Sequence, residues 1–266
     1  MNTEMNYIEK NKAAWNTRTD HHFKSTFYDV DGFIKGQDSL NDIELKLLGN
    51  IQGKTILHLQ CHFGQDTISL ARKGASVTGV DLSDNAINKA MQLAKETNAD
   101  VTFICCDIYD LPEHLDKQFD IVFTSYGTIG WFPDLDKWAA IVSMFLKPGG
   151  KFVFAEFHPV VWMYDNNFEK PTYPYAKSEP IVETEQGTYA DLAAPITTET
   201  VTWNHSISEV LTSLIKYGLE INSFDEFDYS PYNCFNHTIE FEPKKFRIEH
   251  FGNKIPMVYS FGATKK

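Results

Sequence analysis

The fold of the chain is decided by residues 56–67, which read ILHLQCHFGQDT. The apolar run at residues 55–60 is short enough for a buried strand, and residues 67–72 continue as a helix after a turn. Beyond this segment, apolar strands without polar alternation recur along the chain and are separated by helices. This pattern is typical of a parallel sheet with helices on both faces. Such doubly wound α/β proteins bind their ligands at the carboxyl ends of the strands.

The remaining elements follow the same rhythm. With the first strand, six further strands make seven, and they are expected at residues 75–80, 101–106, 119–125, 151–157, 220–228 and 254–264. Helices are expected at residues 7–16, 38–48, 84–94, 135–146 and 207–217. Ser83 is a good N-cap for the third of these helices. Residues 147–150 (KPGG) are expected to form a turn that stops the fourth helix.

Residues 158–204 break the rhythm, because they are rich in Pro, Tyr, Glu and Thr and have no clear period. We therefore expect a single domain in four parts. These parts are an N-terminal helical cap (1–50), a cofactor-binding core (51–157), a lid or substrate insertion after the fifth strand (158–204), and a closing helix with strands (205–266). The expected fold class is a doubly wound, mostly parallel, seven-stranded α/β sheet.

Composition narrows the function further. A chain of 266 residues suits one large α/β domain, and a formal charge of −12 disfavours nucleic acid or an anionic membrane as partner. The first residues lack the basic start and apolar run of a signal peptide, and no apolar stretch is long enough to span a bilayer. Four cysteines form no disulfide framework in a chain of this size. These features predict a cytoplasmic protein that acts on a small molecule, and they leave its oligomeric state open.

The loop at residues 60–64 lies where a dinucleotide-binding chain carries Gly-x-Gly-x-x-Gly, but only Gly64 is a glycine. Glycines in that pattern leave room for a pyrophosphate. Gln60 and His62 fill this room, which argues against NAD or FAD. The polar side chains of His58, Gln60 and His62 instead suit a small charged group, such as the carboxylate of a methionine-type tail.

Acidic residues end the next two strands. Asp81 follows the second strand, where a carboxylate usually accepts hydrogen bonds from two ribose hydroxyls. Asp107 follows the third strand, where it suits an adenine amino group. Both are also common residue types just before a helix, so capping is the alternative interpretation of each. Together with the loop they describe an adenosine with a short zwitterionic tail and no phosphate.

Five segments, in this order, resemble the motifs of the class I S-adenosylmethionine-dependent methyltransferases. They are residues 59–64 (LQCHFG), 77–83 (VTGVDLS), 106–112 (CDIYDLP), 119–127 (FDIVFTSYG) and 146–150 (LKPGG). More specifically, the chain resembles an uncharacterised bacterial group with a Leu-Gln-Cys-His-Phe-Gly first motif, and this resemblance includes residues 11–15 and 229–232. The usual first motif of the family has an acid in place of His58 and glycines in place of Gln60 and His62.

The resemblance implies a Rossmann-like methyltransferase fold and S-adenosylmethionine as the cofactor. It assigns the ribose to Asp81, the adenine to Leu82, Asp107 and Ile108, and the methionine amino group to the neighbourhood of Thr124 and Ser125. Because His58, Gln60 and His62 replace the usual residues, the resemblance does not say how the methionine end is held.

Three side chains are candidates for substrate contact or proton transfer. Glu156 and His158 flank the last residue of the fifth strand, at the edge of the sheet that faces the ligand. His205 lies after the insertion and before a helix. The alternatives are a solvated strand end with a local hydrogen bond for the first two, and a helix-capping region for His205. A base is needed only when the nucleophile must lose a proton, since the cofactor itself activates the methyl group.

Aromatic residues are abundant, with 20 Phe, 12 Tyr and 5 Trp. Most aromatic residues pack in cores. Those outside any strand or helix period are expected to line a substrate pocket, to which further aromatic residues contribute if the N-terminal helix folds over the ligand crevice. The candidates are Trp15, Tyr28, Tyr126, Trp131, Trp162 and Tyr232.

A metal site is not expected. His58, Cys61 and His62 match no standard zinc spacing, and strand alternation directs Cys105 and Cys106 to opposite sides. Cys61 is expected to be a small buried hydrophobic residue.

The sequence thus predicts an enzyme that transfers a methyl group from S-adenosylmethionine to a small molecule by in-line displacement. Two alternatives stay open. A non-catalytic sensor would bind the same cofactor in a closed site, and a nucleotide-dependent oxidoreductase shares the architecture but is disfavoured by the missing glycines.

Overall fold

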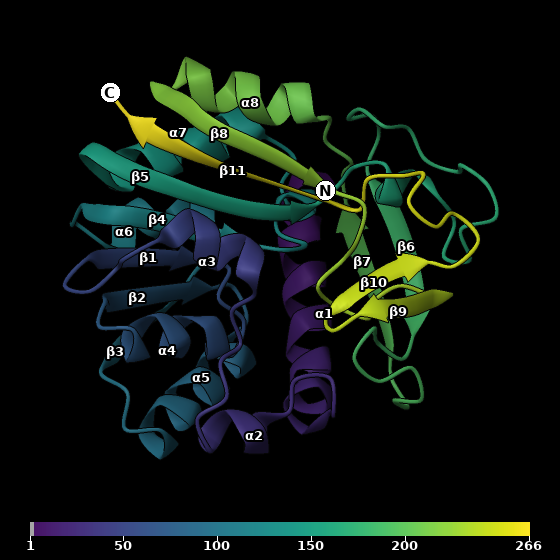
Figure 1. Ribbon diagram of the computed structural model, residues 1–266, viewed down its shortest axis with the longest axis horizontal. Coiled ribbons are helices and arrows are strands. Elements are labelled where there is room, and N and C mark those ends of the chain that lie inside the picture. The colour runs from purple at the N-terminus through teal and green to yellow at the C-terminus, as the bar shows by residue number, and fades with distance from the viewer. Residues whose placement is uncertain (1–2) are drawn as a thin grey trace.

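A computed structural model describes residues 3–266, with side chains from Tyr7 onward. Its centre is a seven-stranded sheet of order β3-β2-β1-β4-β5-β11-β8 (Figure 1). The parallel part consists of β1 (Thr55–Leu59), β2 (Ser76–Asp81), β3 (Val101–Cys105), β4 (Phe119–Ser125) and β5 (Leu146–Phe157). β11 (Val258–Lys265) runs antiparallel to both β5 and β8 (Leu219–Phe227). The expected seven-stranded, mostly parallel sheet is confirmed.

Helices cover both faces of this sheet, as the doubly wound fold requires (Figure 1). One face packs against α3 (Asp42–Leu48), α4 (Gln65–Arg72) and α5 (Asp84–Glu96), and the other against α6 (Leu111–His114), α7 (Leu135–Phe145) and α8 (Ile207–Lys216). Successive side chains of β1 point to opposite faces of the sheet. Leu57 packs in the core beneath α7 and α8, and Ile56 packs in the core beneath α3 and α4. Ser83 caps α5 by accepting a hydrogen bond from the amide of Ala86.

Four expected boundaries were wrong: α3 and β11 each begin four residues later than expected, and two further differences change the local structure. The first helix, α1 (Thr3–Lys24), continues well past residue 16, because the basic and aromatic residues that follow stay helical and pack against distant segments. Residues 147–150 belong to β5 instead of forming a separate turn: Leu146 already pairs with Phe119, and Lys151 pairs with Ile121 after an irregular register. The Pro and Gly residues therefore distort the start of the strand without ending it.

A smaller lobe lies beyond the carboxyl ends of the strands, on the other side of α1 (Figure 1). It contains the antiparallel pair β6 (Ile181–Gln186) and β7 (Thr197–Thr202) and the hairpin of β9 (Thr238–Glu242) and β10 (Lys245–Ile248). Both pairs lie in segments where the sequence predicted none. The strands β6 and β7 consist largely of Thr, Glu and Gln, so they show no apolar run. A five-residue helix, α2 (Val30–Ile34), follows α1.

The insertion is fixed to α1 by buried polar contacts. Asn11 Nδ2 donates to the carbonyl of Val201 at 2.8 Å, and the amide of Val201 donates to Asn11 Oδ1 at 2.9 Å. Arg18, only 5% exposed, donates to Thr198 Oγ1 and to Glu185 Oε2. Thus α1 and β7 act as one packed unit across the strand ends. Within residues 3–266, every helix is too short or too polar to cross a bilayer.

Candidate functional site

The loop after β1 has the backbone of a glycine-rich loop. Gln60, His62 and Gly64 have φ angles of 55°, 50° and 79°, in the left-handed region that favours glycine. A Cβ on Gly64 would lie 2.7 Å from Cζ of Phe103, so only glycine fits that position. The two substituted positions therefore keep the backbone course of the usual motif and add polar side chains to it.

Asp81 joins this loop to the end of β2. Its Oδ2 accepts from the amide of His62 at 2.8 Å, and its Oδ1 accepts from the amide of Ser83 at 2.9 Å. Burial raises the pKa of Asp81 to about 6. Each carboxylate oxygen has two acceptor positions, so one remains on each for a ligand. The capping role is present, and it leaves the expected ribose contact available.

Asp107 has a similar position after β3. Its Oδ1 accepts from the amide of Tyr109 at 2.7 Å and caps the 3₁₀ turn of Ile108–Asp110, while burial raises its pKa. Ile108 is 4% exposed within the α7 core, and Leu82 lies between Asp81 and the N-cap of α5. The residues predicted to bind ribose and adenine thus follow adjacent strands, β2 and β3.

His58 is placed differently from Gln60 and His62. Its Nδ1 lies 2.8 Å from Thr67 Oγ1 in α4, its ring packs against Phe123, and burial lowers its pKa to about 3. A neutral imidazole there supports α4 under the loop. The structure therefore does not bring His58 together with the side chains of Gln60 and His62 at the strand ends.

Thr124 and Ser125 end β4 beside the loop. Thr124 Oγ1 donates to the carbonyl of Leu59 at 3.3 Å, and Ser125 Oγ donates to Asp66 Oδ2 at 3.4 Å. Asp66 lies in the first turn of α4, and burial raises its pKa. Sequence reasoning missed Asp66, although it lies only two residues after the first motif.

Three buried polar atoms at these strand ends have no hydrogen-bond partner among the described residues. They are Gln60 Oε1, His62 Nε2 and His22 Nδ1. Gln60 is held at its other amide atom, since Nε2 donates to the carbonyl of Thr128 at 2.8 Å. Buried polar atoms are almost always satisfied, so these three are candidate contacts for a ligand or for ordered water. Sequence reasoning did not single out His22, because its position in space depends on the length of α1.

Aromatic residues surround the two histidines. The ring of Trp15 lies 5.3 Å from His62 and 5.4 Å from Trp131, and the ring of Tyr28 lies 5.4 Å from both His22 and His62. Trp131 is oriented by its Nε1, which donates to the carbonyl of Gly127. The structure thus brings together three predicted pocket residues, which we call the Trp15 cluster: Trp15, Tyr28 and Trp131.

Tyr126 and Tyr232 form a second group, with ring centroids 5.2 Å apart. Tyr126 donates its hydroxyl hydrogen to Glu44 Oε2 at 2.8 Å, and Asn41 Nδ2 donates to the hydroxyl of Tyr232. Glu44 is fully buried, and desolvation together with the charge of Asp66 raises its pKa to about 7. Glu44 was also missed, because its place in the capping box of α3 explains it locally.

Trp162 lies apart from both groups. Its side chain is 41% exposed and packs edge-on against Phe157 and Phe235. Of the six predicted pocket residues it is the one that is exposed, whereas the other five are partly buried.

Glu156 holds a loop in place. It is 1% exposed, and its oxygens accept hydrogen bonds from the amides of Gly127, Thr128 and Ile129 and from the hydroxyl of Thr128. Burial raises its pKa, while these donors oppose the rise. The geometry therefore makes Glu156 an anchor for the loop that carries Tyr126 and Trp131.

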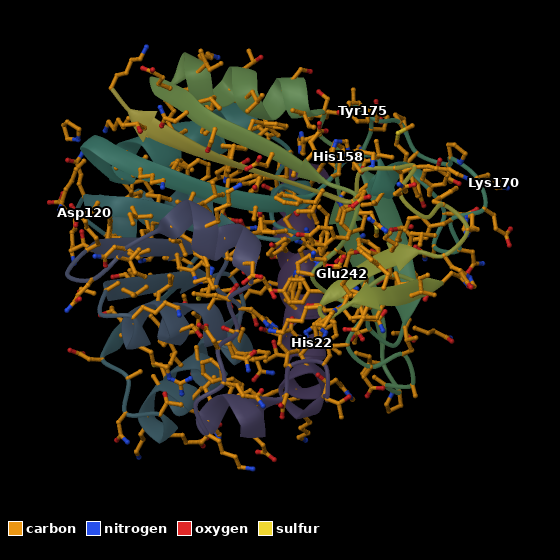
Figure 2. All side chains as sticks on the ribbon, in the orientation of Figure 1. His22, Asp120, His158, Lys170, Tyr175 and Glu242 are labelled. Atoms are coloured by element: carbon orange, nitrogen blue, oxygen red, sulfur yellow. The ribbon has the colours of Figure 1, made fainter. Side chains whose placement is uncertain are left out.

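The two histidine candidates belong to separate contact sets. His158 Nε2 lies 2.9 Å from Glu226 Oε1, and its Nδ1 accepts from the amide of Val160; burial lowers its pKa and Glu226 opposes that shift. His205 Nε2 lies 2.8 Å from the carbonyl of Phe132, and its Nδ1 lies 3.1 Å from Glu209 Oε2. Figure 2 shows His158 well apart from His22. The structure does not bring the three catalytic candidates into one group.

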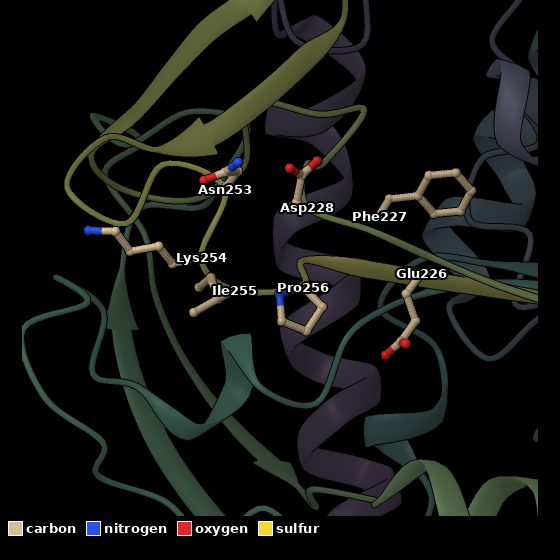
Figure 3. Close-up of a pocket in the computed structure, with 7 residues that line it drawn as sticks. All are labelled: Glu226, Phe227, Asp228, Asn253, Lys254, Ile255 and Pro256. Atoms are coloured by element: carbon tan, nitrogen blue, oxygen red, sulfur yellow. The ribbon is translucent and has the colours of Figure 1, made fainter.

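A surface pocket of about 310 Å³ lies beside the partner of His158 (Figure 3). It is formed by the end of β8 and the loop before β11, with the residues Glu226, Phe227, Asp228, Asn253, Lys254, Ile255 and Pro256. None of the residues predicted to bind the cofactor lines it, so it is distinct from the site at the strand ends.

The cysteines follow strand alternation, with Cys105 exposed and Cys106 buried, and Cys61 is buried as expected. In the described part of the chain, no three His, Cys, Asp or Glu side chains form a group that suits a metal ion.

Known proteins resemble this chain in sequence. A family model described as a methyltransferase domain matches residues 56–150. A ubiquinone biosynthesis O-methyltransferase from Idiomarina loihiensis is 30% identical over 135 residues, which cover 49% of this chain and 55% of that protein. The chain spans about half the length of the curated relatives it matches.

Solved structures show the same fold. An S-adenosylmethionine-dependent methyltransferase from Mesorhizobium loti has a TM-score of 0.61 at 23% identity, covering 87% of this chain and all of that one. A putative S-adenosylmethionine-dependent methyltransferase from Listeria monocytogenes has a TM-score of 0.58 at 22% identity, covering 84% of this chain and 96% of that one. The chain therefore has the Rossmann-like fold of these proteins.

Proposed function

We propose that the chain binds S-adenosylmethionine at the carboxyl ends of β1 to β4 and transfers its methyl group to a small molecule. The observation that carries this proposal is the hydrogen bond between Asp81 and the loop of Gln60 and His62. Both lie within the segment that matches the methyltransferase domain. Within that class, the LQCHFG motif supports membership of an uncharacterised bacterial group that carries this variant of the first motif.

The residues present fit the cofactor. Asp81 has free acceptor positions for two ribose hydroxyls, and Asp107 with Ile108 and Leu82 frames the adenine. The unpaired Oε1 of Gln60 accepts from the methionine ammonium, near Thr124 and Ser125. His62 Nε2 supplies a further polar contact.

When bound, the cofactor supplies a methyl group already activated on a sulfonium. The protein then has to align the acceptor and exclude water. Asn11 and Arg18 fix α1 to the insertion and so form a cover over the strand ends, with residues 158–204 as the lid of a single four-part domain. Glu156 is a positioning residue, because it fixes the loop that presents Tyr126 and Trp131.

The acceptor is a small apolar or aromatic-bearing molecule that lies among the Trp15 cluster, Tyr126 and Tyr232, with Trp162 at the outer edge. Six aromatic side chains from distant parts of the chain favour such an acceptor, because they offer apolar area with few polar groups. The net charge of −12 disfavours a nucleic-acid acceptor. A cytoplasmic location is part of the proposal, and it is supported by four cysteines that form no disulfide framework.

Isothermal titration with S-adenosylhomocysteine tests the binding half of the proposal, and transfer of a labelled methyl group to a panel of small acceptors tests the chemical half. Absence of binding would refute the proposal, and tight binding of NAD in its place would favour an oxidoreductase. Binding of S-adenosylmethionine without transfer to any acceptor would favour a sensor.

A further inference from the structure

His22 is a fully buried histidine of α1 with one unpaired ring nitrogen. Its Nε2 lies 2.9 Å from Thr188 Oγ1 in the insertion, and its Nδ1 has no partner among the described residues. Figure 2 shows His22 on α1, between the large sheet and the smaller lobe. The ring thus lies between the cofactor loop and the insertion.

The contacts of Thr188 determine which nitrogen of His22 carries the hydrogen. Thr188 Oγ1 accepts from the amides of Ala190 at 3.0 Å and Asp191 at 3.3 Å. A hydroxyl has two acceptor positions and one hydrogen, so its hydrogen remains to be donated to His22 Nε2. Burial, with the charges of Arg18 and His21, lowers the pKa of His22 to about 3, so the ring is neutral. Its hydrogen therefore lies on the unpaired Nδ1.

The surroundings indicate what this N–H binds. The ring of His62 lies 5.2 Å away, with Nε2 also unpaired, and the rings of Trp15, Tyr28 and Tyr189 enclose the pair. In the described part of the chain, no carboxylate hydrogen-bonds to either imidazole. A buried donor near the positive charge of Arg18 suits an oxygen acceptor, either neutral or anionic, and disfavours an ammonium group.

We infer that His22 donates its Nδ1–H to an oxygen atom of a bound ligand, beside His62. The inference rests on the proposed function. The oxygen atom has two possible sources, and both would accept the same kind of hydrogen bond. It belongs either to the carboxylate of the cofactor's amino-acid tail or to a hydroxyl or carbonyl group of the methyl acceptor.

The ring nitrogens of His22 report directly on this contact. The experiment follows the ¹⁵N signals of His22 by NMR in the full chain during four titrations. The first pair of probes, S-adenosylhomocysteine and 5′-methylthioadenosine, differs in the amino-acid tail, which only the former carries. The second pair, phenol and benzylammonium, is added with saturating S-adenosylhomocysteine. Phenol offers an oxygen atom to the histidine, whereas benzylammonium offers an ammonium group. A shift with S-adenosylhomocysteine but not 5′-methylthioadenosine assigns the cofactor carboxylate. A shift with phenol but not benzylammonium assigns the acceptor. No shift in any titration, or a shift with benzylammonium alone, overturns the inference.

Two variants separate this contact from a merely structural one. Asn places its amide nitrogen near the position of Nδ1, whereas Gln places its amide near the position of Nε2. We expect His22→Asn to bind the responding probe within about threefold of the native chain and His22→Gln to lose about tenfold or more. A greater loss for His22→Asn would show that only the Thr188 contact matters and would overturn the inference.

The control is His114→Asn, an exposed histidine at the end of α6. It should leave probe affinity unchanged, and thermal unfolding confirms that each variant folds. If S-adenosylhomocysteine fails to bind the native chain, the proposed function fails, whereas the phenol and benzylammonium titrations, repeated without it, still test His22.

Discussion

The backbone amide of His62 donates a 2.8 Å hydrogen bond to Asp81 Oδ2, so that the loop after β1 and the end of β2 form one unit. A side chain at residue 62 is compatible with the left-handed turn because this bond holds the backbone in place. The bond connects two of the motifs that the sequence presented separately, and it places a buried carboxylate beside the loop.

Replacing Asp81 by Ala should weaken S-adenosylhomocysteine binding by about tenfold or more, because buried hydrogen bonds to a charged acceptor are lost. Isothermal titration at pH 7.5 measures this effect. The matched control is Asp100→Ala, at an exposed position in the turn before β3, which should bind normally. An unchanged affinity in Asp81→Ala would remove Asp81 from the cofactor site.

Glu44 should make stability depend on pH. Its pKa is raised from 4.5 to about 7 in the folded protein, so the folded state holds the proton more tightly than the unfolded chain. Stability therefore falls as the pH rises from about 4.5 to about 7, and the loss persists above that range. Glu44→Gln should remove this part of the slope and gain about 3 kcal/mol relative to the native chain between pH 4.5 and 8.

Urea unfolding at a series of pH values measures the Glu44 effect. Asp66 and Asp81 also have raised pKa values, so some slope in the same direction should remain in the variant. Glu113→Gln, at an exposed position in α6, should follow the native curve. Parallel curves for Glu44→Gln and the native chain would mean that Glu44 is ionised as easily as an exposed glutamate.

Gly64→Ala should destabilise the protein by about 2–4 kcal/mol, because it adds a left-handed alanine and a collision with the ring of Phe103. Gly218→Ala separates the two effects. Gly218 has a φ of +84°, close to that of Gly64, but nothing within 4 Å of the added Cβ, so it should cost only about 1–2 kcal/mol. Equal losses in urea unfolding would show that Phe103 does not restrict Gly64.

Asn11→Ala should loosen the insertion, because both backbone groups of Val201 lose their partner. Unpaired buried backbone groups cost about 1–3 kcal/mol each. Hydrogen exchange at residues 197–202 should therefore become faster, while exchange in β1 and β4 stays the same. Asn88→Ala, at an exposed position in α5, should change neither. Unchanged protection of β7 against hydrogen exchange would show that the contact between Asn11 and Val201 does not hold the insertion against α1.

The central strands of the large sheet were predictable because they are short apolar runs buried on both faces, as β1 and β4 show. β6 and β7 were not, because their alternate residues are Thr and Glu with no apolar period to read. The turn expected at residues 147–150 illustrates a different limit. Pro and Gly indicate an irregular backbone, but only the pairing of Leu146 with Phe119 shows that the strand begins earlier.

The candidate site divides in the same way. Asp81 and Asp107 were found from motif spacing, which is local in sequence. The loop contacts of Glu156 and the bond of His22 to Thr188 join residues far apart in the chain, so spacing carries no sign of them. His158 and Glu156 were correctly placed at a strand end, but an end position does not reveal which neighbours a side chain engages.

The bond between Asn11 and Val201 has a consequence for synthesis. The two residues are 190 positions apart, so α1 leaves the ribosome long before β7 exists to receive it. Chains fold during synthesis roughly from the N-terminus onward, and α1 also contacts the loop after β1, where Trp15 packs against His62. A nascent chain that stops before β7 can therefore dock α1 on the sheet, but it leaves the side chain of Asn11 without the backbone partner that β7 later supplies.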